Sequence, residues 1–79
     1  FPSAIEIDSF SRGRIEMLRF KVPETSKIVH MSLRELAGAL QYSLLVCAVE
    51  RNGEVYIPDG NFVVQAKDSL SIITTPQPV

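Results

Sequence analysis

The dipeptide Asn52-Gly53 constrains the fold of this 79-residue chain more than any other feature. It follows a continuous apolar segment, Leu44 to Arg51, that ends in charged residues. Asn-Gly is preferred in a two-residue type I′ turn because both of its central positions need a positive φ. Glu54 to Ile57 should therefore pair back on the apolar segment. The sequence predicts a β-hairpin in the middle of the chain.

Further strands are expected on both sides of this hairpin. Arg14 to Val22 alternates, with Leu18, Phe20 and Val22 on one face, and Pro23 closes it. Downstream, the pattern predicts a turn at Pro58-Asp59-Gly60-Asn61, a short strand at Phe62 to Gln65, a tight connection at Lys67-Asp68 and a last strand with Leu70, Ile72 and Thr74 on one face. The connections are short, which favours antiparallel pairing.

One helix is predicted with a defined start. Ser32-Leu33-Arg34-Glu35 is a capping box, in which the Ser32 hydroxyl and the Glu35 carboxylate satisfy the first backbone amides. Apolar residues then follow at i, i+3, i+4 and i+7, namely Leu33, Leu36, Ala37 and Leu40. This spacing is typical of a two-turn helix that lies on a sheet.

The first ten residues fit two structures. Ser3 could cap a short helix with Glu6 three residues on, and Ile5-Glu6-Ile7-Asp8 also alternates as a strand would. We expect a helix over residues 3–10, with the strand as the alternative. The whole pattern predicts a small α+β domain, in which a mostly antiparallel sheet carries one main helix. One helix covers one face, so the other face or an edge of the sheet needs a partner surface, which points to dimerisation.

Charge and hydropathy exclude several classes of partner. Eight Lys and Arg residues balance nine Asp and Glu residues without a block of one sign, so no surface for nucleic acid or anionic lipid is expected. The longest apolar run, Leu44 to Val49, has six residues, against about 20 for a membrane span. The single cysteine, Cys47, favours a reducing compartment. We expect a cytoplasmic domain with no direct membrane insertion.

Catalytic and metal chemistry find little support in the sequence. The only histidine, His30, and the only thiol, Cys47, are the candidates for a base and a nucleophile. Cys47 lies in the most apolar run, which favours a buried, inert thiol, and His30 is expected in a loop, with contact to a ligand as the alternative. No second Cys or His and no Asp-rich loop is present for a metal. We expect no enzyme activity, no metal site and no cofactor in this fragment.

Three cations are placed where a sheet edge or a dimer groove could present them. These are Arg12, Arg14 and Arg51. The simpler interpretation of each is a solvated surface arginine.

Several motifs, taken in order, resemble the C-terminal domain of the RCK (regulator of potassium conductance) family, in particular that of the TrkA-type regulators of potassium uptake. They are Phe1-Pro2-Ser3-Ala4-Ile5, Ser26-Lys27-Ile28-Val29, Ser32-Leu33-Arg34-Glu35-Leu36, Val46-Cys47-Ala48-Val49-Glu50-Arg51-Asn52-Gly53-Glu54, Ile57-Pro58-Asp59-Gly60 and Asp68-Ser69-Leu70-Ser71-Ile72. At two positions the chain departs from the family pattern. His30 and Lys67 stand where the family commonly has glycine.

The resemblance implies a domain organisation and partners. Residues 1–12 would connect to an upstream Rossmann-type domain that binds NAD(H) or ATP, and residues 13–79 would form the RCK C-terminal regulatory domain. Similar domains dimerise, and some hold cyclic di-AMP in the dimer cleft. The partners implied are a second copy, as a homodimer or higher oligomer, and a membrane potassium transporter subunit, which would hold the protein at the inner face of the cell membrane.

The resemblance also implies candidate ligand contacts. The matching positions are Val46, Cys47, Arg51 and Pro58. An arginine suits a phosphate because its planar fork donates two parallel hydrogen bonds. The predicted function is a ligand-binding and dimerisation module that regulates a Trk/Ktr-type potassium uptake system. The alternative is a purely structural dimerisation module without a ligand of its own.

Overall fold

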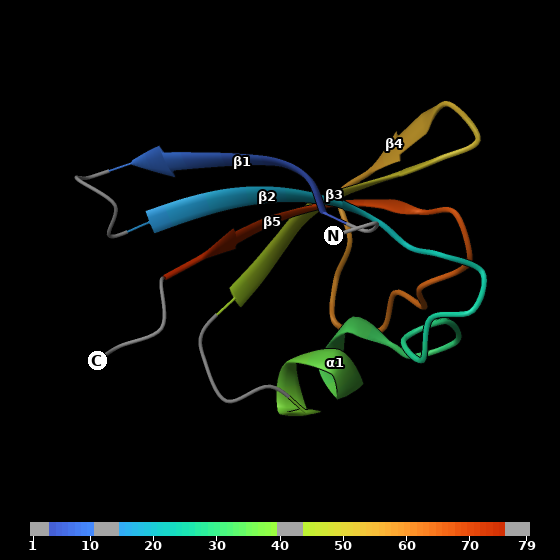
Figure 1. Ribbon diagram of the computed structural model, residues 1–79. Coiled ribbons are helices and arrows are strands. Elements are labelled where there is room, and N and C mark those ends of the chain that lie inside the picture. Colours follow the sequence, from blue (N-terminus) through green and yellow to red (C-terminus); the bar gives the residue numbers. More distant parts are fainter. Residues whose placement is uncertain (1–3, 11–14, 40–43, 76–79) are drawn as a thin grey trace.

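A five-stranded antiparallel sheet organises the computed structural model of the protein, which describes residues 4–10, 15–39 and 44–75 (Figure 1). The elements are β1 (Ala4–Phe10), β2 (Ile15–Lys21), α1 (Leu33–Ala39), β3 (Leu44–Arg51), β4 (Glu54–Tyr56) and β5 (Ser69–Thr74). In the sheet they follow the order β1-β2-β5-β3-β4, and every pairing is antiparallel. The predicted α+β fold is confirmed, and α1 is the one helix among the described residues.

The predicted helix over residues 3–10 is wrong. Residues 4–10 form β1, which pairs with β2 from Ala4 opposite Phe20 to Phe10 opposite Ile15. The alternation in Ile5-Glu6-Ile7-Asp8 was the correct signal, because the free edge of β2 offers a ladder of hydrogen bonds that a short, isolated helix lacks. Residues 4–10 form an edge strand of this sheet, and the connection of residues 1–12 to an upstream domain stays a prediction.

The hairpin and the helix start match their predictions. Asn52 and Gly53 have φ values of 54° and 79°, as a type I′ turn requires. At the helix start, the Glu35 amide donates to Ser32 Oγ at 3.1 Å and the Ser32 amide donates to Glu35 Oε1 at 2.9 Å. The capping box therefore defines where α1 begins. Of the predicted apolar stripe, Leu36 is buried, Ala37 is exposed and Leu40 lies outside the described residues.

The segment Phe62 to Gln65 is not the sheet strand that was predicted. It runs beside the residues that lead into α1 and forms one isolated bridge, between Ser32 and Val63. Three backbone hydrogen bonds hold it there: His30 N to Val64 O at 2.7 Å, Val64 N to Met31 O at 2.8 Å and Leu33 N to Phe62 O at 2.9 Å. The backbone groups of this segment form their hydrogen bonds with residues 30–33 and not with a strand of the sheet. The segment therefore holds the start of α1 in place and does not extend β5.

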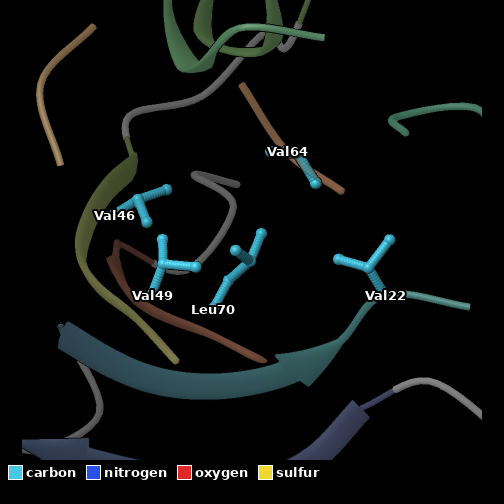
Figure 2. Close-up of a cluster of buried hydrophobic side chains, with 5 residues drawn as sticks. All are labelled: Val22, Val46, Val49, Val64 and Leu70. Carbon is cyan, nitrogen blue, oxygen red and sulfur yellow. The ribbon is translucent and has the colours of Figure 1, made fainter. Parts of the chain in front are cut away.

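The core lies between the sheet and this segment. Figure 2 shows its five buried side chains, Val22, Val46, Val49, Val64 and Leu70, pointing toward one another. Val46 and Val49 are three residues apart on β3, so strict alternation would place them on opposite faces. A register shift between Val46 and Ala48 against β5 restores both to the core face. The continuous apolar run gave no sign of this bulge.

The opposite face of the sheet carries a different set of residues. Figure 1 shows α1 on one side of the sheet. The register and the alternation place Ile15, Met17, Leu45 and Ile73 on the other side, and Leu45 is 61% exposed. Beside them, an ion pair joins Arg19 of β2 to Glu50 of β3 across β5, at 3.5 Å. We call these four apolar residues the open face.

The two departures from the family pattern coincide with unusual backbone. His30 has a φ of 75° and Lys67 a φ of 72°, in the left-handed region that favours glycine. The Lys67 amide donates to Val22 O at 2.7 Å, which fixes this turn against the end of β2. A left-handed backbone at these two positions is consistent with the glycines that the resemblance implies there, and this chain adopts it with His30 and Lys67.

Replacing Lys67 with glycine should stabilise the protein by about 0.5–1 kcal/mol. The left-handed conformation costs a non-glycine residue about 1–2 kcal/mol. Glycine avoids this cost, but it lowers the stability by about 0.5–1 kcal/mol because it loses more conformational entropy on folding. The exposed ion pair from Lys67 to Glu24, at 3.2 Å, contributes little. Urea unfolding of Lys67→Gly measures the gain. Lys67→Ala is the control, since it loses the ion pair and keeps the strain; equal stability of the two variants would contradict this account.

Candidate functional site

A concave site lies where α1, the start of β3 and the turn at residues 58–60 meet. Its cavity has a volume of about 370 Å³, within the range of about 300–1,000 Å³ that is usual for small-molecule sites. The lining is mostly apolar, with Arg34 and Asp59 as its charged members. The described residues that line it are Leu33, Arg34, Ala37, Leu44, Leu45, Val46, Pro58, Asp59 and Gly60.

Two of the four predicted ligand contacts meet in this cavity. Val46 reaches it from β3 and Pro58 from the segment after β4, so residues twelve positions apart in sequence share one wall. The other two, Cys47 and Arg51, are not among the described lining residues. The structure therefore divides the predicted set into a pair at the cavity and a pair elsewhere.

Cys47 lies at the bulge of β3, between the shifted partners Val46 and Ala48. It is a free cysteine and half-buried, and its Sγ lies 3.8 Å from the Leu45 carbonyl oxygen. The sequence favoured a buried, inert thiol, and the structure leaves Cys47 half-buried. The bulge accounts for this exposure, because the extra residue is left unpaired in the ladder.

Arg51 is bound to Asp68. Its Nε donates to Asp68 Oδ1 at 2.8 Å, and its Nη2 donates to Asp68 Oδ2 at 2.7 Å and to the Val63 carbonyl oxygen at 3.0 Å. Its guanidinium also lies 4.8 Å from the ring centre of Phe62 and 5.8 Å from that of Tyr56. The planar fork that suits a phosphate is already filled by a carboxylate of the same chain. A ligand contact at Arg51 stays a prediction, and it would have to compete with this pair.

Asp68 has no exposed surface, yet it stays charged. Burial alone raises the pKa of Asp68, but the hydrogen bonds from the Arg51 side chain and the Gln65 amide, together with the Arg51 charge, hold that pKa below its usual value. The sequence offered only a weak signal for this pair, since seventeen positions separate its members. A buried carboxylate just before the last strand needs a cation, and Arg51 at the end of the neighbouring β3 supplies it.

Other site types have no support in the described residues. Arg12 and Arg14 lie outside them, and His30 is an exposed residue of the turn before α1. Within the described ranges, no group of three or more His, Cys, Asp or Glu side chains could hold a metal ion. In the same ranges, no helix is long and apolar enough to cross a membrane.

Comparison with known proteins gives the family. The profile of the TrkA-C domain family matches residues 17–79, which is most of the chain. This chain belongs to the TrkA-C domain family. Over 78 residues it is 33% identical to the Trk system potassium uptake protein TrkA homolog of Archaeoglobus fulgidus, and over 76 residues it is 30% identical to the Trk system potassium uptake protein trkA homolog 1 of Methanosarcina mazei.

These relatives are much longer than the present TrkA-C domain. The alignments include 99% and 96% of this chain, but only 17% and 18% of the two relatives. The matched part of the TrkA-C domain contains α1, β3 and the turn at residues 58–60, so the whole cavity falls within the family region.

Arg51→Ala should destabilise this TrkA-C domain by about 3–5 kcal/mol, because it leaves the Asp68 carboxylate buried without its partner. Lys27→Ala, which removes an exposed cation, should change the free energy of unfolding by less than about 0.5 kcal/mol. Chemical unfolding monitored by circular dichroism compares the two. A loss below about 1 kcal/mol for Arg51→Ala would show that the pair is not structural.

Proposed function

We propose that this TrkA-C domain is a regulatory ligand-binding and dimerisation module of a Trk/Ktr-type potassium uptake system. The match to the family over residues 17–79 carries the assignment to potassium uptake, because the aligned relatives are named as potassium uptake proteins. The module acts by binding and assembly and not by catalysis. Its partner is a membrane potassium transporter subunit, which holds it on the cytoplasmic side of the membrane.

Dimerisation through the open face supports this function physically. A chain of this size removes only about 60% of its unfolded surface from water, so added burial contributes a large share of its stability. Ile15, Leu45 and Ile73 line a shallow apolar hollow of about 240 Å³ on this face. A second copy related by a two-fold axis would present the same apolar residues to it.

The ligand site of the proposal is the cavity lined by Val46 and Pro58. Its apolar walls suit a flat base. The cavity borders the open face at Leu44 and Leu45, and there cyclic di-AMP, which carries two bases on a two-fold ring, would reach one cavity in each copy of a dimer. The alternative function, a structural dimerisation module with no ligand, needs only the open face. In both cases a nucleotide such as NAD(H) or ATP would belong to another part of the full-length protein.

The dimer proposal predicts that Leu45→Glu produces monomers. A carboxylate on the open face, beside Ile73, would have to be buried unpaired in the dimer. Val63→Glu is the matched control, because Val63 is also an exposed apolar residue, at 43%, and lies beside the helix approach. Sedimentation velocity at high micromolar concentration should show dimers for the unmodified chain and for Val63→Glu. Monomers in the unmodified chain would refute this assembly.

The ligand proposal predicts one cyclic di-AMP per two chains. Ala37→Trp should abolish binding, because the indole would occupy the cavity that Ala37 lines from α1. Ala39→Trp, at an exposed position of the same helix that does not line the cavity, is the control. Calorimetric titration, with ATP and NAD as comparison ligands, measures affinity and stoichiometry. Absence of heat with all three would favour the structural module.

A further inference from the structure

Arg34 is fixed at the mouth of the cavity by its neighbours. It is the second residue of α1, and its amide donates to the Gly60 carbonyl oxygen at 2.9 Å. Its side chain lies across Gly60: a Cβ at position 60 would be 3.2 Å from Arg34 Nη2 and 3.3 Å from Arg34 Nε. Gly60 does not have a positive φ, so its backbone does not require glycine. Because position 60 has no side chain, the Arg34 side chain can lie across it.

The guanidinium of Arg34 is available to a ligand. It is exposed, and within the described part of the chain no ion pair involves it. Asp59 lines the same cavity, but its Oδ1 accepts a hydrogen bond from the Asn61 amide at 2.9 Å and so faces its own turn. Arg34 is thus a positioned cation next to an apolar hollow, whereas Arg51 is occupied by Asp68.

We propose that this cavity binds an organic anion, with a flat apolar group against Leu44, Val46 and Pro58 and the anionic group on Arg34. This inference rests on the proposed function, because it assigns the charge contact of the same cavity. It differs from the sequence prediction, which gave that contact to Arg51.

The chemistry of the lining narrows the ligand class. The guanidinium can donate two parallel hydrogen bonds to one phosphate or carboxylate group. The Asp59 carboxylate, which also lines the cavity, disfavours a second negative group beside it, since like charges repel. A ligand with one anionic group per cavity and a flat apolar body therefore fits better than a small polyanion. Neither half of such a ligand should bind well alone.

Four probe molecules test separately the contributions of the apolar ring and of the anionic group to binding. Phenyl phosphate and benzoate carry an anion on a ring, phenol carries the ring alone, and inorganic phosphate carries the anion alone. Titrations followed by the NMR signals of the Leu and Val methyl groups should show saturable shifts at Leu44 and Val46 with the two aromatic anions. Phenol and inorganic phosphate should bind at least about ten-fold more weakly.

Two variants test the role of Arg34 from both sides. Arg34→Ala removes the cation, and Gly60→Ala displaces it by filling the space that the side chain crosses. Each variant should lower the affinity for phenyl phosphate about ten-fold or more. Arg34→Lys should retain part of this affinity, because lysine keeps the positive charge but lacks the two parallel donors of the guanidinium. Lys27→Ala, which removes an exposed cation that does not line the cavity, should bind as the unmodified chain does.

The outcomes separate this inference from the proposed function. Methyl shifts that persist unchanged in Arg34→Ala would overturn the assignment of the charge contact, and so would the absence of saturable shifts with both aromatic anions. Cyclic di-AMP binding that is unchanged in Arg34→Ala would support the proposed function and contradict the role of Arg34 as the charge contact. Phenyl phosphate binding that depends on Arg34, with no heat from cyclic di-AMP, would support the anion site. It would exclude only cyclic di-AMP as the ligand.

Discussion

The buried pair of Arg51 and Asp68 connects the paired ends of β3 and β5 to the irregular segment that contains Val63 and Gln65. Asp68 lies just before β5, Arg51 ends β3, and the Val63 carbonyl and Gln65 amide belong to the segment that fastens α1. The Val22 amide, at the end of β2, donates to the Asp68 carbonyl oxygen at 2.8 Å. A buried carboxylate with this many partners is satisfied in only one arrangement of the surrounding chain. The pair therefore fixes the path of residues 57–68, on which the cavity depends.

The bulge on β3 has the second large influence on the site. Without the shift between Val46 and Ala48, burial of Val49 would turn Val46 to the open face, because side chains alternate along a strand. With the shift, both valines face the core and Val46 also lines the cavity. One extra residue thus supplies an apolar wall to the site and leaves Cys47 half-buried. The bulge on β3 therefore determines both the packing of the core and the shape of the cavity wall.

Local signals in the sequence predicted the parts of the fold that depend on local chemistry. The Ser32–Glu35 capping box and the Asn52-Gly53 turn are each satisfied within a few residues, and both were confirmed. The errors concern partners that are far away in sequence. β1 is a strand because the edge of β2 accepts it, and Arg51 is occupied because Asp68, seventeen residues later, is buried beside it. For the candidate site, the family resemblance implied Val46 and Pro58, which line the cavity, but it did not imply Arg34, whose position depends on the absence of a side chain at Gly60.

The start of β3 belongs to both surfaces of the proposed function. Leu44 and Leu45 line the cavity beside α1, and they also line the hollow on the open face. A surface that buries Leu45 would restrict the same backbone that forms the cavity wall, and a ligand that orders this wall would present a better-defined surface to a second copy. Coupling between two sites is reciprocal, since each binding event can change the other only by the same free energy. The shared residues would give the proposed ligand binding and the proposed assembly a physical route by which each influences the other.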